Sequence, residues 1–562
     1  MQKKRKFLFF SGLIVVLVFA LVYYGVNLTS NIGKTKDQVT AEDAGKQLSK
    51  LYSKISVSTA EPIKGQIDLN PADVGESLPD ISKFPITVPN STDNFVEIFS
   101  STEKSGSGVD GWLTEVTEEF NKSNIVVDGK PASIKLRNIA SGTAADYIKS
   151  GKYVPDAYTP SNELWGEMVK ANGIETKLIS KRLVGNVPGI VISKAKHDAL
   201  VAKYGSVNVK TITEAIAANE FAMGYTDPFA SSTGLNFLVT ALNTFDSSDI
   251  LGEKAVQGFE QFQANVPFIA STTIQMRDAA KSGMLDGFVL EYQTYVNAAD
   301  LKKSYVFTPF GVRHDSPLYA LGDLPQAKLD ILTKFSEFVA QEKYQKAAEE
   351  KGFNALEDYK SELPAVDGAL LSSAQKLWKE KKNGNKPIMA VFVTDVSGSM
   401  AGEPLNRLKE SLIKGQKFLG KDNSIGLVSY SNNVTINLPI AKYDTNQQSM
   451  FVGAVNSLTA GGGTATFDGI AVAMKMIQDQ MAVNPSVKPL IFVLSDGETN
   501  EGHSLKDIKE LIETYKIPIY TIGYNANIQA LQSISNINEA ASINADTDDV
   551  VYKIGNLFNV QM

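Results

Sequence analysis

The stretch that decides the fold is VFVTDVSGSM, from Val391 to Met400. It begins as an apolar run, stops on Asp395, and then carries two hydroxyls at alternate positions, Ser397 and Ser399. A continuous apolar run is typical of a central parallel strand, which is buried on both faces. Ligands of such sheets gather at the carboxyl ends of the strands. The stretch therefore predicts a strand whose end presents a cluster of oxygen atoms.

Two later stretches carry oxygen-bearing side chains in comparable places. GGGTATFDGI puts Thr464 after three glycines, and IFVLSDGETN puts Asp496 at the end of another apolar run. Between and around them apolar runs alternate with helical patterns, which predicts a doubly wound, Rossmann-like α/β sheet. Strands are predicted at 388–394, 424–431, 434–440, 490–494 and 517–522. An all-oxygen donor set with few carboxylates suits a hard cation such as Mg²⁺.

Residues 387–562 resemble a von Willebrand factor type A domain with a metal-ion-dependent adhesion site. The motif of that family is Asp-x-Ser-x-Ser, then a distant Thr, then a distant Asp. The resemblance implies that Ser397 and Ser399 bind the metal directly, that Asp395 and Asp496 hold its waters, and that Thr464 binds directly or through water. It also implies Mg²⁺, with Mn²⁺ or Ca²⁺ as alternatives, and a coordination position that a carboxylate of a protein partner completes.

The same residues have a plainer interpretation. Asp395 could cap a helix that begins near Glu403, Thr464 could cap the helix after it, and Asp496 with its following glycine could form only a turn. The three-part pattern favours the metal site, because independent caps have no reason to converge on one edge of a sheet.

The middle of the chain, 93–380, resembles a bacterial extracellular solute-binding protein of the two-lobed type II α/β class, with crossovers between the lobes. The resemblance is carried by VEIFSSTEK, ASGTAADYIKSGKYVPDAY, VPGIVISK, DPFASSTGLNFL and GMLDGFVLEY. Hydroxyls at the starts of helices can bind a ligand in the cleft of such a protein, although ordinary helix caps are the favoured explanation. The candidate ligand-binding residues are Ser101, Thr143, Ser232, Thr233, Glu291 and Tyr292.

The N-terminal segment has the pattern of a membrane anchor. Four positive charges lie within residues 1–6, ahead of an uncharged apolar stretch from Phe7 to Leu28. This stretch is long enough for a transmembrane helix, and longer than the apolar part of a cleaved signal peptide, which is the alternative. The excess of positive charge predicts that 1–6 is a cytoplasmic tail, 7–28 a single-pass anchor in the cell membrane, and the bulk of the chain extracellular.

Residues 29–92 follow as a predicted stalk and linker. An amphipathic pattern within it predicts a helix at 37–55, and five prolines between Pro62 and Pro89 predict an extended spacer. A second linker is predicted at the lysine-rich stretch Lys379–Pro387, which is interpreted as a solvated spacer.

Composition excludes several classes of function. The chain has no cysteine and three histidines among 562 residues, so thiolate chemistry is absent and a His-rich zinc site is not expected. A formal net charge of -7 removes the broad basic surface on which nucleic-acid binding rests. We expect a binding or adhesion protein rather than an enzyme. The alternative is a solute receptor of a transport or sensing system, with the C-terminal domain as its docking module.

Overall fold

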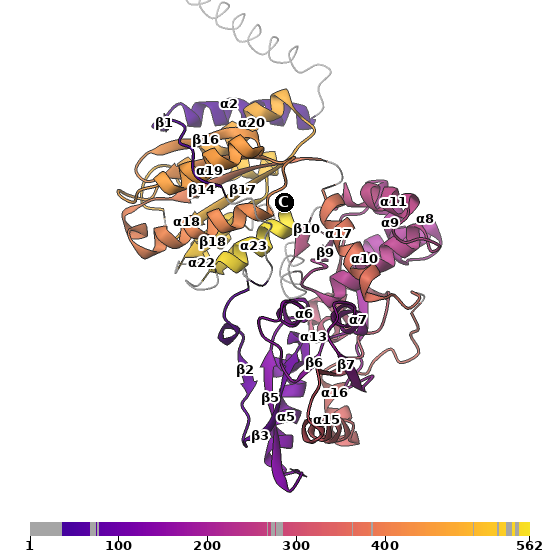
Figure 1. Ribbon diagram of the computed structural model, residues 1–562. Coiled ribbons are helices and arrows are strands. Elements are labelled where there is room, and N and C mark those ends of the chain that lie inside the picture. Colours follow the sequence, from indigo (N-terminus) through magenta and orange to yellow (C-terminus); the bar gives the residue numbers. More distant parts are fainter. Residues whose placement is uncertain are drawn as a thin grey trace, which may run out of the picture.

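The computed structural model describes most of the chain after its N-terminal segment. The described residues are 36–67, 75, 78–266, 268–270, 276, 285–361, 363–383, 386–497, 499–524, 528–535, 542–545 and 550–562. They form two α/β units that lie side by side (Figure 1). The predicted tail at 1–6 and anchor at 7–28 lie outside the described residues. Within the described ranges, no helix combines the length and the apolar character needed to cross a bilayer.

The C-terminal unit is built on a seven-stranded sheet in the order β1-β16-β15-β14-β17-β18-β19. Its strands are β1 (Val57–Thr59), β14 (Ile388–Asp395), β15 (Ser424–Tyr430), β16 (Val434–Lys442), β17 (Lys488–Ser495), β18 (Ile519–Tyr524) and β19 (Ser542–Ala545). Every neighbouring pair is parallel except β15 with β16. The five strands predicted in this region are confirmed, with ends that differ by one or two residues.

Helices cover both faces of this sheet. They are α2 (Lys36–Tyr52), α18 (Glu403–Gly415), α19 (Thr445–Ser457), α20 (Thr466–Val483), α21 (Leu505–Tyr515), α22 (Ile528–Ser535) and α23 (Val550–Gln561), with the 3-10 turns η3 (Gly398–Met400) and η4 (Gln416–Phe418). Alternate residues of β14 point to opposite faces. Phe392 packs among residues of α18, α19 and α23, while Val391 and Val393 pack among residues of α2, α20 and α21. The sheet is therefore doubly wound, as predicted.

The N-terminal segment belongs to this unit and does not form a separate stalk. In Figure 1, α2 lies beside α20, and β1 adds to the open edge of β16. Leu48 is fully buried there, and Gly65 is hydrogen-bonded to Ser449 beyond the strand. The prediction of a helix near 37–55 is confirmed, but the prediction of a stalk and spacer over 29–92 is wrong for 36–67, because the apolar stripe of α2 is covered by the C-terminal unit.

The middle unit consists of two lobes, each with its own sheet. Lobe 1 has the order β2-β5-β3-β6-β13-β7, and lobe 2 has the order β10-β9-β11-β8-β12. The strands of lobe 1 are β2 (Ile86–Val88), β3 (Asn94–Ser100), β4 (Val126–Val127, paired with β5), β5 (Lys130–Asn138), β6 (Ala157–Thr159), β7 (Thr176–Ser180) and β13 (Leu318–Leu321). Those of lobe 2 are β8 (Pro188–Ser193), β9 (Met223–Thr226), β10 (Phe268–Ala270), β11 (Gly287–Glu291) and β12 (Tyr305–Pro309).

The chain passes from lobe 1 to lobe 2 after β7 and returns before β13, so the predicted crossovers are confirmed. The helices of lobe 1 are α4 (Thr102–Ser105), α5 (Trp112–Lys122), α6 (Ser141–Ser150), α7 (Glu163–Ala171), α15 (Gln326–Val339) and α16 (Glu342–Glu350), with η1 (Ile81–Lys83) and η2 (Gly108–Asp110). Those of lobe 2 are α8 (Lys194–Tyr204), α9 (Val209–Ala217), α10 (Ser232–Phe245), α11 (Glu253–Gln263), α13 (Tyr292–Asn297) and α14 (Ala299–Ser304); α17 (Gly368–Lys381) follows. Strand β2 and turn η1 also fall within the predicted spacer, so lobe 1 begins before residue 93.

The two lobes are closed on one another. Trp165 of lobe 1 donates from Nε1 to the Oγ of Ser232 in lobe 2 at 2.9 Å, and the backbone N–H of Gly142 donates to the carbonyl of Ala230 at 3.1 Å. A Cβ at position 142 would lie 2.0 Å from the carbonyl oxygen of Phe229, so only glycine permits this approach. The closed arrangement leaves a small cavity between the lobes.

Helix α23 joins the C-terminal unit to both lobes. The hydroxyl of Tyr552 lies 2.9 Å from Thr143 Oγ1 in lobe 1, and Gln561 donates to the carbonyl of Ile269 in lobe 2 at 3.1 Å. Lys382, just after α17, is buried and donates to the carbonyl of Val560 at 2.6 Å. The prediction of a solvated spacer at Lys379–Pro387 is therefore wrong at Lys382, which takes part in the contact between the units.

Candidate functional site

The oxygen-bearing residues of the C-terminal unit meet at one edge of its sheet. Asp395 is the last residue of β14, and Asp496 follows the last residue of β17. The two strands are parallel neighbours, so both carboxylates leave the sheet at the same edge. The parallel pairing of β14 and β17 thus brings Asp395 and Asp496 together, although one hundred residues separate the two strand ends.

A chain of hydrogen bonds connects these side chains. Asp395 is fully buried, and its carboxylate accepts from the N–H of Ser397 at 2.8 Å and from the Oγ of Ser495 at 2.7 Å. The Oγ atoms of Ser397 and Ser399 are 3.0 Å apart, and Ser399 Oγ donates to Asp496 Oδ1 at 3.0 Å. Two carboxylates and two serine hydroxyls therefore converge on one small volume.

The glycine-rich loop that carries Thr464 borders this cluster. The N–H of Gly398 donates to the carbonyl of Gly462 at 2.9 Å, which ties the loop to the serine turn. Thr464 is 5 % exposed, and its N–H donates to Oδ1 of Asn500 at 2.8 Å. Asn500, which the sequence did not single out, therefore holds Thr464 in place.

The helix-cap alternative is wrong for both Asp395 and Thr464. Helix α18 has Gly402 as its N-cap and α20 has Ala465, and neither cap makes a side-chain hydrogen bond. The carboxylate of Asp395 instead binds the serine turn and Ser495. The hydrogen bonds of Asp395 therefore stabilise the oxygen cluster, and Asp395 does not cap a helix.

The cluster has the chemistry of a site for a hard cation. Burial raises the pKa of Asp496, and the charge of Asp395 raises it further, against the opposing hydrogen bond from Ser399. A cation between the two carboxylates would relieve that repulsion. Within the described residues, no three His, Asp or Glu side chains gather into a metal-ligand group, so a cation here would depend on hydroxyls and water.

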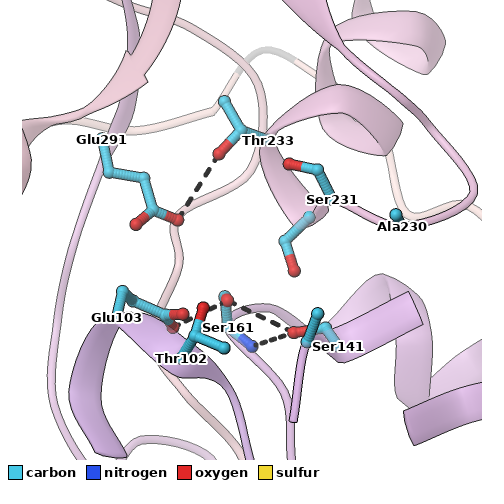
Figure 2. A pocket seen from close by; sticks show the side chains of 10 residues that line it. Thr102, Glu103, Ser141, Ser161, Ala230, Ser231, Thr233 and Glu291 are labelled. Atoms are coloured by element: carbon cyan, nitrogen blue, oxygen red, sulfur yellow. Dashed lines mark hydrogen bonds between the residues drawn. The ribbon is translucent and has the colours of Figure 1, made fainter. Parts of the chain in front are cut away.

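A second candidate site is the cavity between the two lobes, which has an empty volume of about 330 Å³. Lobe 1 contributes Thr102, Glu103, Ala140, Ser141 and Ser161. Lobe 2 contributes Ala230, Ser231, Ser232, Thr233 and Glu291. Figure 2 shows the carboxylates of Glu103 and Glu291 on opposite sides of this space. The wall is thus rich in hydroxyls and carries one acidic side chain from each lobe.

Comparison with known protein families assigns both units. Residues 390–557 match the von Willebrand factor type A domain, and residues 105–354 match the bacterial extracellular solute-binding protein family. The chain joins a solute-binding domain to a von Willebrand factor type A (VWA) domain.

Individual relatives match one domain at a time. Inter-alpha-trypsin inhibitor heavy chain H3 of Mesocricetus auratus is 26 % identical over 178 residues, which are 29 % of this chain and 20 % of that protein. Minor fimbrium subunit Mfa5 of Porphyromonas gingivalis is 28 % identical over 131 residues, 22 % of this chain and 10 % of that protein. Among solved structures, a periplasmic thiamin binding protein has 12 % identity and a TM-score of 0.38, and covers 52 % of this chain and 99 % of its own. The chain thus spans a fifth or less of the length of these two curated relatives.

The predicted ligand residues of the solute-binding domain divide into two groups. Ser232, Thr233 and Glu291 line the cavity. Ser101, Thr143 and Tyr292 are not among the lining residues.

Each of these three side chains makes other contacts. Ser101 donates to Glu103 and accepts from buried Lys104, while Thr143 meets Tyr552 of the VWA domain. Tyr292 packs edge-on against Phe307. These three side chains thus make their contacts outside the lining of this cavity.

Glu103 and Ser161 line the cavity, but neither was predicted to do so. Ser161 donates from Oγ to Glu103 Oε1 at 2.7 Å. Burial alone would raise the pKa of Glu103, but Lys104 and the hydroxyls of Ser101 and Ser161 outweigh it and hold that pKa below its usual value. Burial and the nearby charge of Glu103 raise the pKa of Glu291, although His314 hydrogen-bonds it. The two carboxylates of the cavity therefore repel one another.

Proposed function

We propose that this protein is a membrane-anchored adhesion protein whose VWA domain holds a divalent cation and, through it, an acidic group of a protein partner. Residues 7–28 would anchor it, with the two domains on the outer side of the membrane. Its role would be binding rather than catalysis. The observation that carries the proposal is the convergence of Ser397, Ser399 and Asp496 within hydrogen-bond distance at the edge of the sheet.

The donor set supports Mg²⁺ in particular. Mg²⁺ keeps several of its waters and needs only a partial shell of protein oxygens. Ser397 and Ser399 would provide direct oxygen contacts, with Asp395, Asp496 and Thr464 holding water or the metal. When bound, the cation supplies concentrated positive charge at an exposed edge. Ser399 is itself exposed, so a partner carboxylate has access to the place where that charge would lie.

The test is a titration of the full chain with Mg²⁺, followed by calorimetry and by thermal unfolding. A ligand that binds the folded state alone raises the melting temperature as its concentration passes the dissociation constant. We expect stabilisation of the wild type, and a loss of affinity of about tenfold or more in Ser399→Ala and Asp496→Ala. Asp444→Asn is the matched control, because Asp444 caps α19 and is not part of the oxygen cluster. Equal Mg²⁺ affinity in all four proteins would contradict the proposal.

Partner engagement is tested separately with a glutamate-rich peptide and the same peptide with glutamine at every glutamate. Binding that needs Mg²⁺, glutamate and Ser399 together would support capture of a carboxylate. Binding of both peptides alike, or binding that persists in EDTA, would contradict it.

A second function, capture of a small solute, is supported by the closed cavity between the lobes. In this proposal the solute-binding domain is the receptor of a transport or sensing system, and the VWA domain is its docking module. Native mass spectrometry of the full chain tests it, because a tightly held solute adds its mass to that of the intact protein. A bound small molecule that is lost in Gly142→Ala would support this function. Its absence from freshly purified wild type and from chain incubated with candidate solutes would argue against it.

A further inference from the structure

The charges around the interlobe cavity identify the kind of solute that it would take, provided that the solute-receptor function proposed above is correct. Among the described residues, none of the ten that line the cavity is a lysine, arginine or histidine. Two of them, Glu103 and Glu291, are acids, and they come from different lobes. Closure of the lobes therefore brings two negative charges together.

One buried ammonium accompanies these two carboxylates. The Nζ of Lys104 lies 3.6 Å from Glu103 Oε1, and the Lys104 side chain is 0 % exposed. The same Nζ donates to the carbonyl of Thr159 at 2.9 Å and to the hydroxyl of Ser101. Lys104 is thus held beside Glu103 on the lobe 1 side, and its single charge balances one carboxylate.

Glu291 receives hydrogen bonds but no full positive charge from its own lobe. His314 Nδ1 is 2.7 Å from Glu291 Oε1, and Thr233 Oγ1 is 3.4 Å from the same oxygen. The protonation state of His314 therefore decides whether Glu291 is neutralised.

Two side-chain amides lie beside His314 Nε2. Nε2 is 3.1 Å from the amide of Asn162 and 3.3 Å from Nδ2 of Asn236. The orientation of the Asn236 amide is fixed, because it donates to the carbonyl of Val312 and accepts from the N–H of the same residue. The Nδ2 of Asn236 is thus a donor beside Nε2, and a proton on Nδ1 is donated to Glu291.

The residues that line this hydroxyl-rich cavity thus carry two carboxylates and no basic side chain, and Lys104 lies beside one of the two acids. A buried charge without a counter-charge is costly, and an anionic solute would add to that cost. A positively charged solute would remove it.

We propose that the cavity binds a small solute with a protonated amine, with the ammonium group between Glu103 and Glu291 and the rest of the solute hydrogen-bonded to the serine hydroxyls. The ammonium has three donors, which suits carboxylates on two sides. The space between the lobes is small, so the solute is small.

The test compares three probes of matched size on the full wild-type chain: ethanolamine, ethylene glycol and glycolate, which carry one positive, no and one negative charge. Binding is measured by calorimetry and by the melting temperature of the solute-binding domain. We expect ethanolamine to bind at least about tenfold more tightly than the other two, the difference that one charge-assisted hydrogen bond typically supplies. This comparison within the wild type needs no variant to fold.

Variants then locate the charge. Glu291→Gln should lower the affinity for ethanolamine by about tenfold or more and leave that for ethylene glycol unchanged. Glu342→Gln, at an exposed carboxylate on α16, is the matched control and should change neither. Tighter binding of glycolate or ethylene glycol than of ethanolamine would overturn the ligand class and leave the receptor function intact. If none of the three probes binds and no solute copurifies, the receptor function itself fails, and this inference fails with it.

Discussion

The hydroxyl of Tyr552 lies 2.9 Å from Thr143 Oγ1. The last helix of the VWA domain is thus hydrogen-bonded to α6, a helix of lobe 1 that borders the solute cavity. Ser141, two residues before Thr143, lines that cavity. On the other side, α23 reaches lobe 2 through Gln561 and Ile269. The same helix therefore contacts both lobes, and a change in lobe separation must alter at least one of these contacts.

We expect the pair of Tyr552 and Thr143 to couple the stabilities of the two domains. Tyr552→Phe and Thr143→Ala should each destabilise the chain, and a double-mutant cycle should give a coupling of about 1 kcal/mol. Urea unfolding, with one probe in each domain, is the measurement. Tyr524 and Ser411 offer a control pair with the same 2.9 Å separation inside the VWA domain. The control cycle should shift the unfolding midpoint of the VWA domain alone. If both cycles shift the midpoints of the same domain or domains, the pair of Tyr552 and Thr143 does not couple the two domains.

Gly142→Ala should open the lobes. The added Cβ would lie 2.0 Å from the carbonyl oxygen of Phe229, a contact that backbone movement alone can relieve. The expected result is a larger radius of gyration in small-angle scattering, with α6 still folded by circular dichroism. Ser150→Ala, at the other end of the same helix, should leave the scattering curve unchanged. A wild-type curve from the Gly142→Ala protein would mean that the lobes do not close in solution as described.

Leu48→Ala should destabilise the VWA domain by about 2 to 4 kcal/mol, the usual cost of truncating a fully buried leucine. Leu48 lies in α2, far from the rest of the domain in sequence. This result would therefore show that α2 is packed on the VWA domain and is not part of a free stalk. The measurement is denaturant unfolding of the VWA domain within the full chain. Lys46→Ala, on the exposed face of the same helix, should have an effect below about 0.5 kcal/mol.

Asp227 should make stability depend on pH between about 4 and 6. Burial raises the pKa of this carboxyl from 3.8 to about 6. The folded chain therefore holds the proton more tightly than the unfolded chain, so this contribution is greatest below pH 4 and is lost as pH rises to 6. Two pKa units correspond to about 3 kcal/mol.

Asp227→Asn removes the titrating group and should flatten the stability profile over the same interval, with a gain near pH 7. Thermal unfolding at pH values from 4 to 7.5 checks this. Exposed Asp323→Asn should keep the wild-type slope. An unchanged slope in Asp227→Asn would show that another group causes the dependence.

The strands of the VWA domain were predictable because burial on both faces leaves a direct pattern in the sequence. β14 is apolar along most of its length, and parallel neighbours end at one edge, so Asp395 and Asp496 could be brought together before any coordinates. Asn500 could not be found, because it acts through the backbone of Thr464 and has no motif of its own.

Contacts between distant segments were not predictable. β1 has three residues, too few for a pattern, and its Ser58 meets Thr435 across 377 positions. Closeness in sequence was also a poor guide to which helix residues line the cavity. Successive residues of a helix turn by about 100°, so Ser141 lines the cavity while Thr143 contacts the VWA domain. Glu103 lies in the four-residue helix α4, where no periodicity can indicate a face.

The position of β1 at the edge of the VWA sheet has a consequence for synthesis on the ribosome. Chains generally fold domain by domain from the N-terminus as they emerge. Helix α2 and β1 are translated before their docking partners, β16, α20 and α21, which follow only after the whole solute-binding domain. The apolar face around Leu48 must therefore remain uncovered while the solute-binding domain is made, which exposes it to aggregation on the ribosome.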